Sequence, residues 1–129
     1  MTADAKRMVD LQQAAAVDAY FYQHLIAQDS LLAEVLERSK QHPIPFVHVS
    51  PTQGKLLKLL VQMMAAKRVL EIGTLAAYST IWMGLALPED GKIITLDYDA
   101  KHVAIARDNI AFAGMSDKIE VLELSLIHI

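Results

Sequence analysis

The sequence contains no cysteine, so it can form neither a disulfide framework nor a thiolate metal site. It has no apolar run near the roughly 20 residues that a membrane helix needs. Residues 1–20 carry acids and lack the apolar core of a signal peptide. Basic clusters are also missing, and the net charge of −3 does not fit a non-specific nucleic-acid binder. We therefore expect a cytoplasmic protein that does not bind membranes or nucleic acid, although a modified RNA nucleoside stays open as a substrate.

Glycine is scarce where a dinucleotide-binding loop would need it. Residues 69–79 predict a buried strand that runs through a tight loop into a helix, and Gly73 is the only glycine among them. A dinucleotide site wants the spacing G-x-G-x-x-G, so that pyrophosphate can lie on the helix N-terminus. The loop therefore argues against a dinucleotide.

Two acids stand near the ends of consecutive predicted strands. Glu71 lies among apolar neighbours in the first strand, 69–72, where a buried carboxylate is costly unless something binds it. Asp97 follows the second strand, 92–96, where an acid can accept hydrogen bonds from ribose hydroxyls. A ligand with adenosine and no phosphate fits this pattern, which favours S-adenosylmethionine. Two other roles stay open, because Glu71 can pair with a lysine or cap loop amides and Asp97 can be a solvated loop acid.

The rest of the chain predicts one α/β domain. An apolar share of 53% suits a sheet covered on both faces, and 129 residues can bury a core. A third strand is expected at about 119–122. Apolar periodicity predicts an amphipathic helix at about 5–27 and a helix over 78–87. Capping residues mark three more helices. One follows the N-cap pair Asp29-Ser30 and ends at 41–45, one starts at the capping box of Ser50 and Gln53, and one lies between the N-cap Asp99 and Gly114.

Residues 69–79, 87–97 and 106–110 together resemble the cation-dependent O-methyltransferase family. This is the class I, S-adenosylmethionine-dependent group that includes caffeoyl-CoA and catechol O-methyltransferases. The resemblance covers about 47–122 clearly and the earlier helices more loosely. It implies the N-terminal part of a Rossmann-like, doubly wound α/β sheet, with three parallel strands preceded by helices. We expect a helical segment over 1–46 and a partial cofactor-binding domain over 47–129.

The resemblance also implies S-adenosylmethionine as the cofactor and a set of residues that hold it. The residues implied at its amino-acid end are Glu71, Gly73, Thr74 and Ser79, with Asp97 at the ribose and Val49 as a further contact. At the position of Val49 the family usually has a hydroxyl-bearing residue. The implied reaction is methyl transfer to a hydroxyl of a small-molecule acceptor, a small aromatic or a nucleoside.

A Mg-type divalent cation belongs to the complete family protein, but its ligands are not in this chain. The five histidines show no metal-ligand spacing. No catalytic residue can be named, and the leading helices are equally consistent with an acceptor entrance, a cover for the sheet or a dimer contact. We expect a homodimer.

The sequence departs from the family pattern at two places. Ala77 replaces a glycine before Tyr78, and alanine at positive φ would cost about 1 kcal/mol, roughly a fivefold loss of affinity if only the bound state is strained. After the third strand, Leu124 and Leu126 replace a glycine and an alanine that touches adenine. The family domain has roughly 200 residues or more, as a full doubly wound sheet requires. We therefore expect a C-terminally truncated, poorly active fragment whose last few residues are not native to the fold.

Two other readings stay open. A nucleotide-dependent oxidoreductase shares the sheet and the acid after the second strand. A non-catalytic fragment could instead associate with another copy through the open edge of the first strand, because an unpaired strand edge is a template for pairing.

Overall fold

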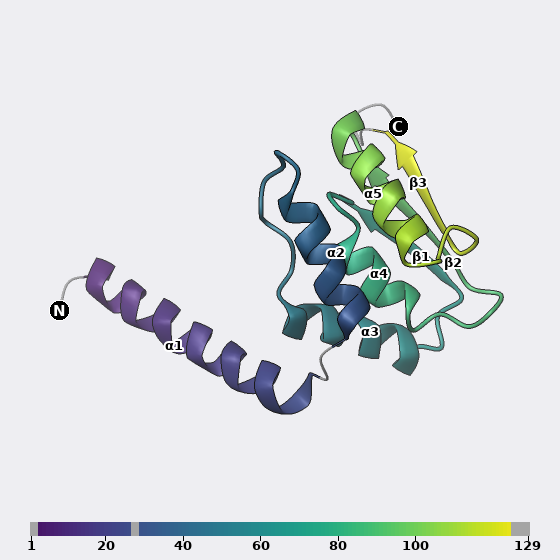
Figure 1. The fold of residues 1–129 in the computed structure, drawn as a ribbon. Helices are drawn as coiled ribbons and strands as arrows, with labels where there is room; N and C mark the ends of the chain where they lie inside the picture. Colours follow the sequence, from purple (N-terminus) through teal and green to yellow (C-terminus); the bar gives the residue numbers. More distant parts are fainter. Residues whose placement is uncertain (1–2, 27–28, 125–129) are drawn as a thin grey trace.

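The computed structural model describes residues 3–26 and 29–124 (Figure 1). The elements are, in chain order, α1 (Ala3–Leu25), α2 (Ser30–Lys40), α3 (Pro51–Met63), β1 (Arg68–Ile72), α4 (Tyr78–Gly84), β2 (Lys92–Asp97), α5 (Ala100–Phe112) and β3 (Ile119–Glu123). Leu126, one of the departures from the family pattern, lies outside the described residues.

The described strands form one parallel sheet in the order β1-β2-β3. Ile72 is paired in register with Leu96, and Leu96 is paired with Leu122. Helix α4 connects β1 to β2, and α5 connects β2 to β3. The predicted α/β class, with three parallel strands preceded by helices, is confirmed. Because parallel strands end at one edge of the sheet, the residues that follow β1 and β2 lie side by side there.

Helices cover one face of this sheet. On that face Ile93 and Ile119 are buried, in contact with elements α4 and α5. Side chains alternate between the faces of a strand, and on the opposite face Leu70, Ile72 and Ile94 are 65%, 57% and 40% exposed. The composition suggested a sheet with helices on both faces. In the described part of the chain, helices cover one face and leave these three side chains of the other face exposed.

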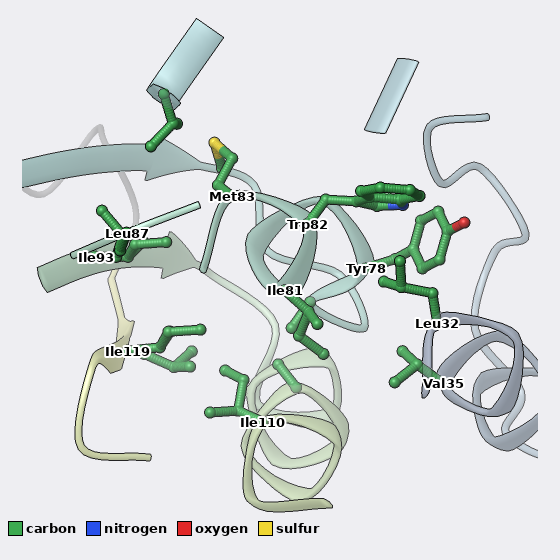
Figure 2. Packing of buried hydrophobic residues seen from close by; sticks show 14 of the residues in the cluster. Leu32, Val35, Tyr78, Ile81, Trp82, Met83, Leu87, Ile93, Ile110 and Ile119 are labelled. Atoms are coloured by element: carbon green, nitrogen blue, oxygen red, sulfur yellow. The ribbon is translucent and has the colours of Figure 1, made fainter. Parts of the chain in front are cut away.

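The hydrophobic core lies between the covered face of the sheet and the helices (Figure 2). Ile81 of α4 is fully buried near its centre, with Ile110 of α5 and Ile119 of β3 to one side and Leu32 and Val35 of α2 to the other. The core thus holds α4 in place, and with it the loop that precedes this helix.

Helix α3 packs tightly on α4. Gly54 of α3 is buried against the indole of Trp82, and an ideal Cβ added at Gly54 would lie 2.3 Å from the Cδ1 and Nε1 atoms of that ring. A side chain at this position would therefore force the two helices apart.

The expected capping signals are present. Ser50 and Gln53 form a complete capping box at the start of α3, and the side chains of Asp29 and Asp99 accept hydrogen bonds from Leu31 N and Lys101 N. Gly114 follows α5 with a φ of +68°, as a C′ glycine does. Helix α4 ends at Gly84 and not at 87 as expected. Pro88 disfavours helical geometry at the residue before it, and the chain turns ahead of this proline.

Helix α1 differs from the expectation of an amphipathic helix. Leu11, Phe21 and Leu25 are all exposed, so the apolar residues do not gather on a buried face. Figure 1 shows α1 extending away from the sheet. Among the described residues, a hydrogen bond from Thr52 Oγ1 of α3 to the Asp18 carboxylate connects α1 to α3.

Candidate functional site

The loop between β1 and α4, residues 73–77, has an unusual backbone. Gly73, Leu75 and Ala77 have φ angles of +91°, +50° and +64°. The left-handed region costs a non-glycine residue about 1–2 kcal/mol, so this loop persists only if other contacts compensate. Within the backbone, Gly73 N donates to Leu96 O at 2.8 Å and Ala77 N donates to Thr74 O at 2.8 Å.

Asp97, at the end of β2, stabilises this loop. Its Oδ2 accepts hydrogen bonds from Thr74 N at 3.0 Å and from Leu75 N at 2.8 Å. Its Oδ1 accepts one from Asp99 N at 3.0 Å and lies 3.2 Å from His102 Nδ1. The carboxylate is thus bound to both strand-end loops of the sheet.

The charge of Asp97 is stabilised by these contacts. Burial alone would raise the pKa of this carboxyl, which is only 6% exposed. The amide hydrogen bonds from Asp99 and Leu75 and the nearby His102 outweigh burial and lower the pKa below its usual value. An ionised carboxylate only accepts hydrogen bonds, so His102 Nδ1 is the donor in the contact between them.

These four donors also limit what else Asp97 can bind. An ionised carboxylate has about four lone-pair positions, and Thr74, Leu75, Asp99 and His102 each direct one donor at them. A ligand hydroxyl therefore reaches Asp97 only by sharing an oxygen with one of these donors or by replacing it.

Glu71 lies on the covered face and accepts hydrogen bonds from three hydroxyls. Ser79 Oγ donates to its Oε1 at 2.6 Å, while the hydroxyls of Thr80 and Thr95 donate to Oε2. Thr95 Oγ1 also lies 2.7 Å from Thr74 Oγ1. No lysine is among the partners of Glu71 in the described part of the chain. The side chain thus links β1 to the start of α4 and, through Thr95, to the loop.

A second clamp reaches the loop from α5. Asn109 is 1% exposed, and its Nδ2 donates to the carbonyl of Ala76 at 3.0 Å and to Ser39 Oγ at 3.2 Å. Its Oδ1 accepts from Arg38 Nε at 3.3 Å. The loop is therefore fixed by β2 on one side and by α5 and α2 on the other.

A cavity of about 480 Å³ opens beside the ends of β1 and β2. Its lining consists of Val47, Ile72, Gly73, Leu75, Leu96, Asp97, Tyr98, His102 and Leu124. This volume lies within the range of small-ligand sites. A larger hollow of about 780 Å³ lies at the other ends of the strands, lined in part by Arg68 and Lys92. Ligands of doubly wound sheets bind beyond the carboxyl ends, which favours the smaller cavity.

The structure brings only some of the predicted site residues to this cavity. Gly73 and Asp97 line it. Thr74 is buried and contributes its amide to Asp97. Glu71 and Ser79 are hydrogen-bonded to each other and do not line the cavity.

Val49 is also not part of the lining. It packs against the hydrophobic core, whereas Val47, two residues earlier, lines the cavity. In an extended segment two residues separate side chains on the same side, so the sequence offered no signal to prefer one over the other.

The sequence interpretation missed two polar residues of the site. Thr95 occupies a covered-face position of β2, between Ile93 and Asp97, and this alternation was readable from the sequence. His102 stands three residues after the N-cap Asp99, on the first turn of α5, and its ring faces Asp97 and Asp99. No metal-ligand spacing marks this histidine in the sequence.

The described residues contain no group of three or more His, Asp or Glu side chains that could hold a metal ion. None of the described helices is long and apolar enough to cross a membrane.

A family model described as O-methyltransferase matches residues 22–126. The chain belongs to the O-methyltransferase family. Catechol O-methyltransferases of Niastella koreensis and Mycobacterium tuberculosis are 45% and 42% identical to it over 106 residues, which is 82% of this chain and 48% of each relative. The family suggested by the sequence resemblance is thereby confirmed.

Solved structures agree with this membership. The O-methyltransferase from Bacillus cereus, crystallised in complex with SAH, superposes with a TM-score of 0.83 at 47% identity. That match covers 88% of this chain and 52% of the other. The chain therefore spans about half the length of the family members it matches.

Proposed function

We propose that the protein to which these residues belong is an S-adenosylmethionine-dependent O-methyltransferase. The observation that carries the proposal is the cavity at the carboxyl ends of β1 and β2, lined by Gly73 and by the ionised Asp97, in a chain of this family. The complex of the Bacillus cereus relative with SAH supports the same cofactor here.

The cavity fits the nucleoside half of this cofactor. Its mixed lining offers Tyr98 and Leu124 as apolar or aromatic surface for a base and Asp97 as an acceptor for ribose hydroxyls. We assign Gly73 and Thr74 to the amino-acid end, because they follow β1 directly. Glu71 then braces this end by holding Ser79 and Thr80 at the start of α4. Val49 is kept as a contact of lower weight, since its side chain packs on the core.

When bound, S-adenosylmethionine supplies a methyl group activated on a positively charged sulfur. The residues of this chain contribute to that chemistry by orientation: the clamped loop and Asp97 hold the cofactor so that an acceptor oxygen can approach the methyl in line. The divalent cation that the family resemblance implies has no ligand cluster among residues 3–26 and 29–124, and no step of this proposal involves it.

We propose a small molecule with a free hydroxyl as the acceptor. The names of the two catechol O-methyltransferase relatives support an aromatic hydroxyl, and a nucleoside hydroxyl is the other candidate. We keep the division into a helical segment, 1–46, and a cofactor-binding part, 47–129, as part of this proposal.

The structure gives a further reason to prefer this cofactor to a dinucleotide. The loop amides of Thr74 and Leu75 already donate to Asp97. A pyrophosphate needs free amide donors at this place, and these two are in use. A nucleotide-dependent oxidoreductase is therefore the less favoured candidate.

Thermal unfolding of the 129-residue chain tests the proposal. We expect SAH at millimolar concentration to raise the melting temperature and NAD at the same concentration to leave it unchanged. A ligand at ten times its Kd stabilises by about 1.4 kcal/mol, which such a scan resolves. Protection by NAD and not by SAH would refute the proposal. We expect no turnover from these residues alone.

We also propose that this chain self-associates in solution, as a homodimer. The exposed apolar face that includes Leu70, Ile72 and Ile94 supports this, because faces of this kind drive association. Light scattering that finds only monomer at high concentration would contradict it.

A further inference from the structure

The four hydrogen bonds to Asp97 raise the question of which donor gives way when a ribose hydroxyl binds. Three of the donors are backbone amides, of Thr74, Leu75 and Asp99. Two of these belong to the loop that Asn109 also holds, and the third is the amide of the N-cap of α5. None of the three can leave Asp97 unless the backbone itself moves.

The fourth donor, His102, is a side chain and can leave Asp97 without a movement of the backbone. Its contact with Asp97, at 3.2 Å, is the longest of the four, and it belongs to a side chain that rotates about two single bonds. Its ring is 14% exposed and lines the cavity. A second carboxylate, of Asp99, lies 3.9 Å from its Nε2, so the ring has another acceptor toward which it can turn.

We propose that His102 donates to Asp97 Oδ1 at the position that a ribose hydroxyl takes when the cofactor binds. This inference rests on the proposed function and goes beyond it, because it makes His102 a residue that tunes the affinity for ribose-bearing ligands. His102 acts through Asp97 and is a positioning residue. Binding then exchanges one hydrogen bond for another, and His102 lowers the affinity by competing with the ligand.

The test replaces His102 with residues that keep or remove the donor. In His102→Phe the ring stays and the Nδ1–H is lost; in His102→Asn the side-chain amide keeps a donor near the position of Nδ1. The probes are SAH, adenosine and 2′,3′-dideoxyadenosine, the last of which lacks both ribose hydroxyls. Affinities are measured with the 129-residue chain by ligand-observed NMR, and a thermal scan checks that each variant is folded.

We expect His102→Phe to bind SAH and adenosine about fivefold more tightly, the factor for one net hydrogen bond of about 1 kcal/mol. His102→Asn should stay within twofold, roughly the limit of such a comparison. The affinity for 2′,3′-dideoxyadenosine should not change in either variant, and a purely structural role of His102 would not separate the two nucleosides. Weaker binding of adenosine to His102→Phe, or equal changes for both nucleosides, would overturn the inference.

A measurement on the unmodified chain covers the case in which His102→Phe does not fold. The ¹⁵N resonance of His102 Nδ1 should move when adenosine is added, because its hydrogen bond to Asp97 is released. An unchanged resonance at saturating adenosine overturns the inference and leaves the proposed function intact. If the unmodified chain binds neither SAH nor adenosine, the proposed function itself has failed.

Discussion

The substitution Asp97→Asn tests how the loop between β1 and α4 is held in place. Asparagine keeps the shape of the side chain, but it replaces one carboxylate oxygen with an NH₂ group that cannot accept a hydrogen bond. Two donors then lose their acceptor, either the amides of Thr74 and Leu75 or the amide of Asp99 together with His102. The amides of Thr74 and Leu75 belong to the loop that carries backbone strain, and the other pair lies at the start of α5.

The expected loss of stability follows from these contacts. A hydrogen bond to a charged group contributes about 1.5–3 kcal/mol. Two such bonds at the lower limit give about 3 kcal/mol, and the lower limit applies because the cavity beside Asp97 admits water. We expect Asp97→Asn to lower the free energy of unfolding by about 3 kcal/mol at pH 7, measured by urea denaturation with circular dichroism.

The pH dependence gives an independent check. The pKa of Asp97 is lowered in the folded chain, so its contribution to stability is complete above the pKa of the unfolded chain, about 3.9. The contribution is lost as the pH falls through the lower folded value. The difference in stability between the unmodified chain and Asp97→Asn should therefore shrink below about pH 4.

A matched control is Asp99→Asn. Asparagine caps helices about as well as aspartate, so we expect a change below about 0.5 kcal/mol. If Asp97→Asn unfolds as the unmodified chain does, or if the difference stays constant down to pH 3, then the hydrogen bonds to Asp97 do not hold the loop.

Three further substitutions test the packing around the site by urea denaturation. Ala77→Gly relieves about 1–2 kcal/mol of backbone strain. It also loses about 0.8 kcal/mol from burial of the methyl and about 0.4–1 kcal/mol because glycine gives the unfolded chain more conformational freedom. The stability should stay within about 1 kcal/mol, whereas a loss above about 2 kcal/mol would mean that Ala77 is not strained. Gly54→Ala should destabilise by about 1–3 kcal/mol, because its Cβ would overlap the ring of Trp82, and an unchanged tryptophan emission would argue against this contact. Thr95→Val should cost about 1–3 kcal/mol by removing a hydroxyl that donates to Glu71, and Thr95→Ser, which keeps the hydroxyl, should cost less.

The elements of the fold could be predicted from the sequence because their signals are local. The capping box at Ser50, the N-cap at Asp99 and the glycine at 114 each mark a helix end by chemistry within a few residues. The strands were readable as short apolar runs between turns. The parallel arrangement of the three strands came from the family resemblance.

The partners of the two acids could not be predicted in the same way. The sequence indicated that Glu71 is special because a carboxylate is costly to bury alone. It singled out Asp97 because an acid after the second strand can accept hydrogen bonds from ribose hydroxyls. Which groups satisfy them depends on tertiary structure: Thr95 reaches Glu71 from a neighbouring strand, and the loop amides reach Asp97 across the sheet edge. The two valines at 47 and 49 show the same limit, because the path of an irregular segment decides which of them faces the cavity.

The position of Ala77 shows how strain and binding are connected in this loop. Its methyl is fully buried in the core, and its φ is +64°. The strain therefore contributes to the free energy of folding, where the contacts of Asp97 and Asn109 offset it. Strain that is equal in the free and bound states does not change affinity. The fivefold loss of cofactor affinity that the sequence suggested would follow only if this strain fell on the bound state alone.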